Sequence, residues 1–426
     1  MRNVGTSPAS VLYITANVEH PPVGGPALRV ETSVKALAQI CDLHICNARS
    51  LSLELHDNTR RHYSRVCRHF IDLPSTNRSK SSRRQPFFLR ILRKFQRIKN
   101  TGVTSRLSDD AFLAEYARKH GVSILWFGHA TGGLWPLMKG VRKIAPRLQI
   151  VCDTDSVWSR FILRELPYAE SAERRLEIER AGKVKEEEEF DWMSDSNVVT
   201  AVSQTDFDHY RGLTTHPQRI HLFSNVIDTD TYRNVPPAAN GLQGPCICLA
   251  GSFYLNSPMA DAARWMIHDV LPLVRRKIAD LRLYIIGRGS DTIMSDIEDP
   301  YITITGEVPS VLPYLCHADV AVVPLRFESG TRFKILEAGA CSIPVVSTTL
   351  GAEGIPVTHG KDILIADEPE SFAGSIVRLV EDKCFAVEMA ETLKELVVER
   401  YNVDSLEQEG RLILEYLSRS SSGRST

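Results

Sequence analysis

The sequence predicts an α/β protein of two doubly wound, Rossmann-like domains whose parallel sheets face each other across a cleft. Short β-branched runs alternate with amphipathic stretches along almost the whole chain. The expected strands are nearly continuous apolar runs, which is typical of parallel strands covered by helices on both faces. A length of 426 residues exceeds one ordinary core and suits two domains. Such sheets bind ligands at the carboxyl ends of their strands.

The strands and the domain boundary can be assigned from the same pattern. Strands are expected at Ser10–Asn17, Asp42–Asn47, Val122–Gly128, Leu148–Asp153, Asn197–Val202, Arg219–Phe223, Cys246–Gly251, Leu281–Gly287, Ile302–Thr305, Asp319–Val323, Pro344–Ser347 and Asp362–Ala366. Pro, Gly, Ala and Asn replace the periodic pattern at Asn234–Gly244, which indicates an interdomain linker. We therefore expect a first domain over 1–237 and a second domain over 238–400. Residues 401–426 are expected to form a last helix, able to pack back on the first domain, and a polar tail.

Composition excludes some classes of protein. The 51 Lys and Arg balance 52 Asp and Glu, which argues against a surface that binds nucleic acid throughout. No apolar run reaches the ~18 residues of a membrane span, and the first residues do not resemble a signal peptide. The nine cysteines are scattered without CxxC spacing, which favours reduced thiols over disulfides or a zinc site. The expected location is therefore the cytoplasm.

One basic segment stands apart. Arg78–Lys99 has nine Lys or Arg and no acid, and its apolar residues recur at helical spacing. Such a helix can lie on an anionic membrane surface, which would put the protein at the inner face of a membrane and favour a lipid-linked acceptor. It can equally place its apolar stripe in the core, which is what helices generally need, and we favour this interpretation slightly.

The most informative stretch is Val322–Ala352, in which a buried strand is followed by a polar turn and a helix expected to start near Thr331. A helix start presents unpaired N–H groups and a partial positive charge. Gly330 lets the backbone approach a ligand closely. Lys334 adds a cation, and Glu337 on the same helical face can accept hydrogen bonds from both ribose hydroxyls. The pattern fits a nucleotide diphosphate, and it also fits an ordinary capped helix with a Lys–Glu surface pair.

The order of several motifs decides between these interpretations. The chain reads PLRFESGTRFKILEAGACSIPVVSTTLGAEGI from Pro324 onward, preceded by NVIDTDTY, GSFYLNSPMADAARWMIHDVLP and LRLYIIGRG. In this order, the motifs resemble the donor-binding half of glycosyltransferase family 4 (group 1), the retaining GT-B enzymes. The resemblance covers the C-terminal half well and the N-terminal half more loosely. It implies a GT-B fold and transfer of a sugar from a UDP- or GDP-linked donor to a saccharide, lipid-linked or protein acceptor.

Carried onto this chain, the resemblance implies donor contacts for residues after two strands. Glu337 would bind the ribose, and Gly330 and Thr331 would contact the diphosphate. Gly251 and Ser252 open the second domain in the family pattern. The first of the family's two glutamates is replaced by Ser329, next to Glu328, and the usual Arg and Lys after Gly251 are missing. The leaving diphosphate still needs cations, so we assign them to Arg332 and Lys334, with Arg326 as a third.

Two loops of the first half complete the expected site. Gly24 and Gly25 form a glycine-rich turn between the first strand and the first helix, a common anion site, although a plain flexible connection has the same composition. His129 follows an apolar strand where the family often has a histidine on the donor sugar; a structural histidine is the alternative. Asp153 and Asp155 resemble a D-x-D-S segment of the family, and acceptor contact or helix capping would explain them.

No metal and no cofactor are expected, because helix dipoles and cations can replace a metal in GT-B enzymes and the nucleotide sugar is a substrate. Three other functions remain open. A nucleotide-sugar 2-epimerase shares the fold and donor site. A non-catalytic nucleotide-sugar-binding relative would fit the missing Arg, Lys and first Glu. A dinucleotide oxidoreductase would need GxGxxG, which Gly287–Ser290 does not supply.

Overall fold

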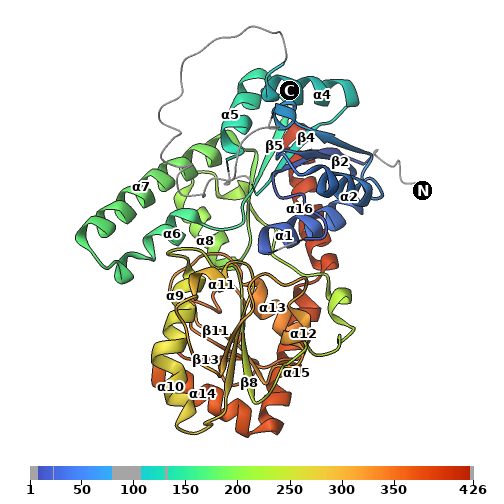
Figure 1. Ribbon diagram of the computed structural model, residues 1–426. Helices are drawn as coiled ribbons and strands as arrows, with labels where there is room; N and C mark the ends of the chain where they lie inside the picture. The colour runs from blue at the N-terminus through green and yellow to red at the C-terminus, as the bar shows by residue number, and fades with distance from the viewer. Residues whose placement is uncertain (1–7, 23, 79–106, 130–132, 423–426) are drawn as a thin grey trace.

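The structure is a computed structural model that describes residues 8–22, 24–78, 107–129 and 133–422. Two parallel sheets, each covered by helices, form an upper and a lower domain (Figure 1). The predicted class of two doubly wound α/β domains is confirmed.

The first sheet has seven strands in the order β3-β2-β1-β4-β5-β6-β7. They are β1 (Ser10–Thr15), β2 (Asp42–Asn47), β3 (His69–Asp72), β4 (Ile124–Gly128), β5 (Gln149–Asp153), β6 (Val198–Ala201) and β7 (Ile220–Leu222). Strand β3 was not expected, because it is a short edge strand of which only Phe70 is fully buried, so it has no apolar run to reveal it.

The second sheet has six strands in the order β10-β9-β8-β11-β12-β13. They are β8 (Cys246–Ala250), β9 (Arg282–Ile286), β10 (Ile302–Ile304), β11 (Val320–Val323), β12 (Val345–Ser347) and β13 (Leu364–Ile365). Strand order reverses between β1 and β4 in the first sheet and between β8 and β11 in the second. Ligands of open parallel sheets bind at such reversals, beyond the carboxyl ends of the strands.

Helices cover the faces of both sheets. Those around the first sheet are α1 (Gly25–Ala38), α2 (Leu53–Tyr63), α4 (Asp109–His120), α5 (Trp135–Ile144), α6 (Trp158–Leu163), α7 (Ala172–Asp195) and α8 (Gln204–Leu213), with short turns η1 (Pro74–Arg78), η4 (Leu166–Tyr168), η5 (Pro217–Arg219) and η6 (Thr229–Tyr232). Those that follow are α9 (Pro258–Trp265), the π-helical η7 (Met266–Val270), α10 (Leu271–Arg275), α11 (Ser290–Ile293), α12 (Leu312–Leu315), α13 (Phe333–Ala340), α14 (Pro369–Glu381), α15 (Lys383–Arg400) and α16 (Val403–Ser422).

Serine caps fix several of these helix starts. Ser52, Ser171, Ser203 and Ser257 each accept a hydrogen bond from the backbone N–H three residues further on, which satisfies one of the unpaired donors of the first turn. The helices α2, α7, α8 and α9 therefore begin at positions that the sequence itself specifies.

The last helix, α16, belongs to the core of the first domain, although the chain reaches it only after the second. In Figure 1 it rises into the upper domain beside α1. Leu406, Ile413 and Leu417 are buried in one cluster with Leu37 and Phe223. Polar contacts add to this packing, since the Glu409 carboxylate accepts hydrogen bonds from the backbone N–H and the hydroxyl of Ser224 at 2.6 and 2.8 Å. The first domain is thus assembled from both ends of the described chain.

The segment between the sheets, 233–245, has neither helix nor strand. Apart from the backbone of Arg78 in η1, the basic segment Arg78–Lys99 lies outside the described residues, so its membrane interpretation stays a prediction. Every helix in the described part of the chain is too short or too polar to cross a membrane. All nine cysteines are free thiols.

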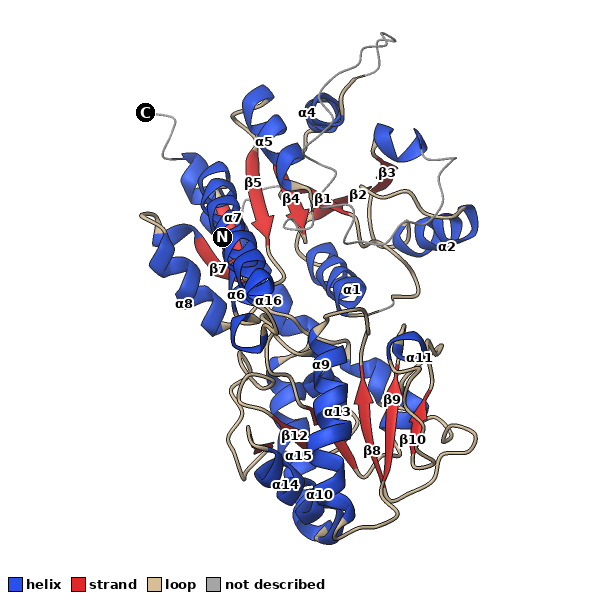
Figure 2. Cartoon of the chain, turned by 60° about the vertical axis from the view of Figure 1, so that its left-hand side comes forward, coloured by secondary structure: helices blue, strands red, loops and turns tan. Residues whose placement is uncertain are grey.

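The two sheets direct their carboxyl ends toward each other. Figure 2 shows the arrowheads of β4 and β5 directed toward the lower domain and those of β8 and β9 directed toward the upper one. The loops that leave these strands therefore meet between the domains, where the reversals of strand order predict ligand binding.

Two neighbouring residues of α16 test its role in the first domain. Ile413 is fully buried, whereas the Leu412 side chain is 62% exposed. We expect Ile413→Ala to lower the free energy of unfolding by about 2–5 kcal/mol through lost burial and a residual cavity. Leu412→Ala should change it by about 0.5 kcal/mol or less. Urea unfolding followed by tryptophan fluorescence measures both, and equal effects would contradict the packing of α16.

Candidate nucleotide-sugar cleft

A cleft of about 620 Å³ lies between the domains. Its walls are the segments that follow β1, β5 and β7 in the first sheet and β8, β9, β10 and β11 in the second. The site therefore forms where the strand ends predict it, with residues from both domains.

The loop between β11 and α13 forms one wall, and it is tighter than the sequence suggests. Helix α13 begins at Phe333, two residues later than expected, because Arg332 is extended and Gly330 has a φ of 85°. A Cβ on Gly330 would also lie 2.8 Å from the carbonyl oxygen of Asp155 in the other domain. Gly330 is thus needed both for its positive φ and for the close approach of the two domains. Ser329 and Thr331 line the cleft beside it.

Lys334 and Glu337 extend this wall along α13, and both line the cleft. Tyr232 of η6 donates its hydroxyl proton to Glu337 Oε1 at 3.0 Å. Burial raises the pKa of Glu337 above its usual value, although the Tyr232 hydrogen bond and the Lys334 charge act in the opposite direction. A carboxylate held by one donor has lone pairs left for a ligand's hydroxyls.

The predicted cations separate into two groups. Arg332 lines the cleft but is buried: its Nε lies 3.1 Å from Glu328 Oε2, and its guanidinium donates to the carbonyl oxygens of Gly330 and Leu350. Its charge therefore serves mainly to hold the loop. Arg326 is not among the residues that line the cleft.

Arg326 is instead engaged by its own surroundings. Its guanidinium pairs with the carboxylate of Asp261 and lies over the ring of Tyr168, 4.6 Å from the centroid. An arginine held in this way is a poor candidate for the leaving phosphate. Arg288, which follows β9, is a cleft-lining cation that sequence reasoning missed. The feature of the sequence that indicates Arg288 is Gly-Arg-Gly directly after an apolar strand, a segment that does not match the GxGxxG motif of dinucleotide-binding proteins.

The predicted glycines allow backbones to meet around the cleft. Gly251 and Ser252 follow β8 and line it, and a Cβ on Gly287 would lie only 1.9 Å from the Gly251 carbonyl oxygen. Gly25 is the first residue of α1 and also lines the cleft. A Cβ there would lie 3.2 Å from the ring of Phe333, so the starts of α1 and α13 touch across the domain boundary.

Two buried hydroxyls in the cleft have no hydrogen-bond partner within the described part of the chain. Ser156 and Ser329 are 7% and 8% exposed, come from different domains, and both line the cleft. Neither hydroxyl has a hydrogen-bond partner among the described residues. Because buried polar groups are nearly always satisfied, this pair points to a polar ligand that approaches both domains.

His129 and Asp155 form a second polar pair at the carboxyl ends of β4 and β5. His129 Nδ1 lies 3.0 Å from Asp155 Oδ2, and the indole N–H of Trp158 donates to Asp155 Oδ1 at 3.1 Å. Burial lowers the pKa of His129, but the charge and hydrogen bond of Asp155 outweigh it and leave the pKa raised. Asp155 lines the cleft; His129 is not among the lining residues, and residues 130–132 beside it lie outside the described part.

Asp153 is placed differently from Asp155. It is fully buried, its carboxylate pairs with Arg29, and it accepts the Thr200 hydroxyl at 2.7 Å. It is also absent from the residues that line the cleft. Asp153 is therefore buried in the first domain behind the cleft wall, whereas the sequence pattern predicted acceptor contact or helix capping for it.

A cluster of His20, Glu31 and His62 could hold a metal ion, with ligand atoms within 4.8 Å of one another. Two imidazoles and a carboxylate suit zinc. The histidine rings are stacked, with centroids 3.5 Å and planes 6° apart, so their in-plane lone pairs run side by side and one ring must turn to share an ion. Glu31 is already held by the Tyr63 hydroxyl at 2.8 Å and by Lys35 at 3.3 Å. None of the three residues lines the cleft.

Comparison with known families gives the class of the second domain. Residues 244–382 match the family model described as "Glycosyl transferases group 1". The match contains the whole second sheet together with α13, and therefore includes Lys334 and Glu337. The matched domain and the two-sheet fold together support a glycosyltransferase of the GT-B type.

Solved structures share the fold over nearly the whole chain. HepE of Anabaena, solved with UDP and glucose, has a TM-score of 0.61 at 12% identity, over 96% of this chain and 100% of that chain. Sucrose-phosphate synthase from Thermosynechococcus elongatus has a TM-score of 0.63 at 16% identity, and the match covers 96% of this chain and 100% of that chain. TarM of S. aureus has a TM-score of 0.66 at 12% identity, and the match covers 95% of this chain and 98% of that chain. At these identities the likeness shows the fold.

One curated relative matches in sequence over a shorter region. It is described as an uncharacterized 44.6 kDa protein in the cps region of Klebsiella pneumoniae, and it is 22% identical over 147 residues. The match covers 32% of this chain and 38% of the relative, less than two thirds of its length.

The His129–Asp155 pair predicts a pH dependence of stability. The folded-state pKa of His129 is raised above the usual 6.5, so the pair stabilises the fold fully below that value and loses its effect as pH rises through the folded-state pKa. We expect His129→Asn, a residue that tolerates the φ of 56° at this position, to destabilise the protein more at pH 6 than at pH 8.5. Thermal melts across this range measure it; a difference that grows with pH would contradict the raised pKa.

Proposed function

We propose that this protein transfers a sugar from a UDP-linked donor to an acceptor hydroxyl, with retention of anomeric configuration. The observation that carries the proposal is the convergence of Lys334, Glu337 and the start of α13 on a cleft that both domains line, within the domain matched to group 1 glycosyl transferases. The solved structures of HepE and TarM contain UDP, which supports the choice of nucleotide.

Each part of the donor has a matching group in the cleft. The diphosphate would lie at the start of α13, against the backbone of Gly330 and Thr331 and the charges of Lys334 and Arg288, because a helix N-terminus favours anions. The ribose diol would donate to the Glu337 carboxylate. The transferred sugar would then lie near Ser156 and Ser329, whose buried hydroxyls have no hydrogen-bond partner among the described residues. The His129–Asp155 pair would lie on the first-domain side of the sugar.

The chemistry requires charge stabilisation more than a protein nucleophile. The acceptor oxygen attacks the anomeric carbon on the face that UDP leaves, the bond from this carbon to the phosphate oxygen breaks, and its electron pair stays on UDP. The acceptor proton passes to the leaving phosphate oxygen. Lys334, Arg288 and the α13 N-terminus would neutralise the developing charge. The acceptor classes to be screened are saccharides (as in polysaccharide biosynthesis), lipid-linked saccharides and proteins.

Nucleotide binding is the first test. We expect calorimetry with UDP, GDP, their common sugar conjugates and NAD to give micromolar binding of UDP and its sugars. Glu337→Ala should weaken UDP binding about tenfold or more, since hydrogen bonds to charged groups contribute about 1.5–3 kcal/mol. Glu381→Ala, which removes an exposed carboxylate of the same domain, is the matched control. Binding of NAD alone would overturn the proposal.

The second test addresses the leaving group. Lys334→Ala should lower kcat/KM for the UDP-sugar about tenfold or more, because a full charge near the departing phosphate is lost. A chelator should leave the turnover of the unmodified protein unchanged, since protein cations replace a metal. Unchanged donor affinity and turnover in Lys334→Ala would count against the assigned site. Binding of a UDP-sugar without transfer to any acceptor would instead favour a 2-epimerase or a non-catalytic relative.

A further inference from the structure

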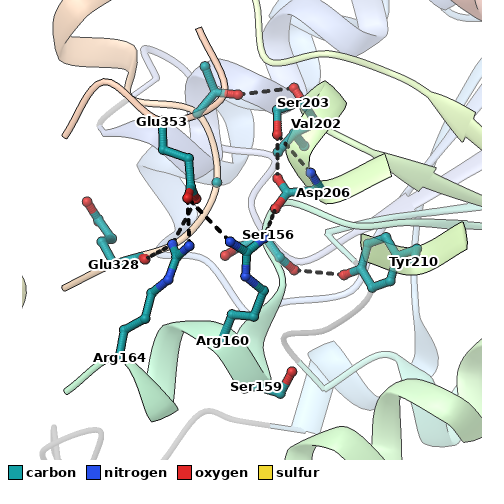
Figure 3. A network of polar contacts seen from close by, with 12 residues as sticks. Ser156, Ser159, Arg160, Arg164, Val202, Ser203, Asp206, Tyr210, Glu328 and Glu353 are labelled. Carbon is teal, nitrogen blue, oxygen red and sulfur yellow. Dashed lines mark hydrogen bonds and ion pairs between the residues drawn. The ribbon is translucent and has the colours of Figure 1, made fainter. Parts of the chain in front are cut away.

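Arg164 and Glu353 form an ion pair that crosses the domain boundary beside the cleft. Arg164 caps the carboxyl end of α6 in the first domain, and Glu353 lies in the loop after β12 in the second. The guanidinium donates two parallel hydrogen bonds, from Nη1 to Glu353 Oε1 at 2.8 Å and from Nη2 to Oε2 at 2.6 Å (Figure 3). A bidentate pair of this kind fixes orientation as well as distance.

Arg164 also contacts the loop that forms the donor wall. Its Nη1 donates to the carbonyl oxygen of Glu328 at 2.7 Å. The Glu328 carboxylate in turn faces Arg332 at 3.1 Å, and Arg332 holds the carbonyl oxygens of Gly330 and Leu350. A continuous series of polar contacts therefore runs from α6 to the residues assigned to the diphosphate.

The pair is partly buried, and further arginines lie close to the Glu353 carboxylate. The side chains of Arg164 and Glu353 are 20% and 24% exposed, and Arg160 adds a second contact to Glu353 at 3.3 Å. Burial raises the pKa of Glu353, but the hydrogen bonds of Arg164 and the charges of Arg164, Arg160 and Arg332 outweigh it and leave the pKa lowered. The carboxylate is therefore ionised at neutral pH.

Two further contacts cross the same domain boundary. The Thr331 hydroxyl donates to the carbonyl oxygen of Val202 at 3.0 Å. Gly354 leaves no room for a Cβ, which would lie 2.8 Å from the Cβ of Ser203. Figure 3 shows the Ser203 and Val202 end of the network beside the Arg160 and Arg164 end. These contacts exist only while the two domains are together.

We propose that Arg164 and Glu353 form an interdomain clasp that positions the donor-binding loop, so that the loop has its binding shape only when the domains are closed. Neither side chain lines the cleft, so both act through Glu328 and its neighbours and are positioning residues. The inference rests on the proposed function, because it assigns the loop to the donor. It predicts that breaking the clasp weakens donor binding and spares the acceptor.

The chain provides a matched control. Arg174 also makes a bidentate pair with Glu165, in which Nε donates to Oε1 and Nη2 donates to Oε2, both at 3.0 Å. The two side chains are similarly exposed, at 25% and 19%. Both residues belong to the first domain, so this pair does not cross the boundary. Arg174→Ala therefore removes an equivalent interaction without opening the clasp.

The test compares Arg164→Ala, Glu353→Ala, the double variant and Arg174→Ala in the full chain. We expect each clasp variant to raise the KM for the UDP-sugar and the Kd for UDP about tenfold, as the loss of a charged hydrogen bond implies. The double variant should lose less donor binding than the sum of the two single losses, because both single variants remove the shared Arg164–Glu353 contact. Arg174→Ala should leave donor binding unchanged, and the clasp variants should leave the KM for the acceptor unchanged. Arg164→Lys should bind the donor better than Arg164→Ala but less well than the unmodified protein, because lysine lacks the planar fork of arginine.

Unchanged donor binding in the clasp variants, additive effects in the double variant, or an equal loss in Arg174→Ala would overturn the proposal. Small-angle X-ray scattering separates it from the proposed function, since it needs no ligand. If the unmodified protein binds no UDP, the function fails, while the clasp still predicts a larger radius of gyration for Arg164→Ala than for Arg174→Ala. Glu353→Gln, which keeps the shape of the side chain, replaces Glu353→Ala if the latter fails to fold.

Discussion

The first domain and the cleft beside it depend on the buried guanidinium of Arg29. It pairs with Asp153 at the end of β5 and donates to the Phe223 carbonyl oxygen at 3.0 Å and to Asn225 Oδ1 at 2.7 Å. A buried charge is costly unless it is paired and hydrogen-bonded, so these partners stabilise the guanidinium most when they are in place together. One side chain thereby ties α1, β5 and the segment leaving β7 together. Since α1 begins directly after the glycine turn, the same interaction sets where that turn meets the second domain.

The two domains contribute different chemistry to the cleft. The second domain supplies Lys334, Arg288 and Glu337 at the ends of its strands and the start of α13, a set suited to a charged, diol-bearing ligand. The first domain supplies Ser156 and Asp155. A ligand that contacts all of them would contact both domains, so its binding would favour the closed arrangement of the domains.

The fold and the local motif could be predicted from the sequence because both are encoded over short distances. Apolar runs fixed the positions of the long strands, and the order of motifs located Gly330, Lys334 and Glu337. The late start of α13 could not be predicted, since it accompanies a positive φ at Gly330 and a close approach of this glycine to Asp155 in the other domain. The pairing of Arg326 with Asp261, the burial of Asp153 and the Arg164–Glu353 pair were equally inaccessible. Each depends on contacts between residues far apart in the chain, which no local pattern records.

The return of α16 to the first domain has a consequence for how the protein is made. During synthesis on the ribosome, domains generally fold as units in the order in which they emerge. Here the first sheet must wait, with the apolar surface around Leu37 and Phe223 uncovered, until the entire second domain has been translated and α16 has emerged. The nascent first domain is therefore the stage at which molecular chaperones have most to bind. The second domain, although made later, encloses a hydrophobic core whose buried residues run from Ile227 to Tyr401 and therefore all precede α16.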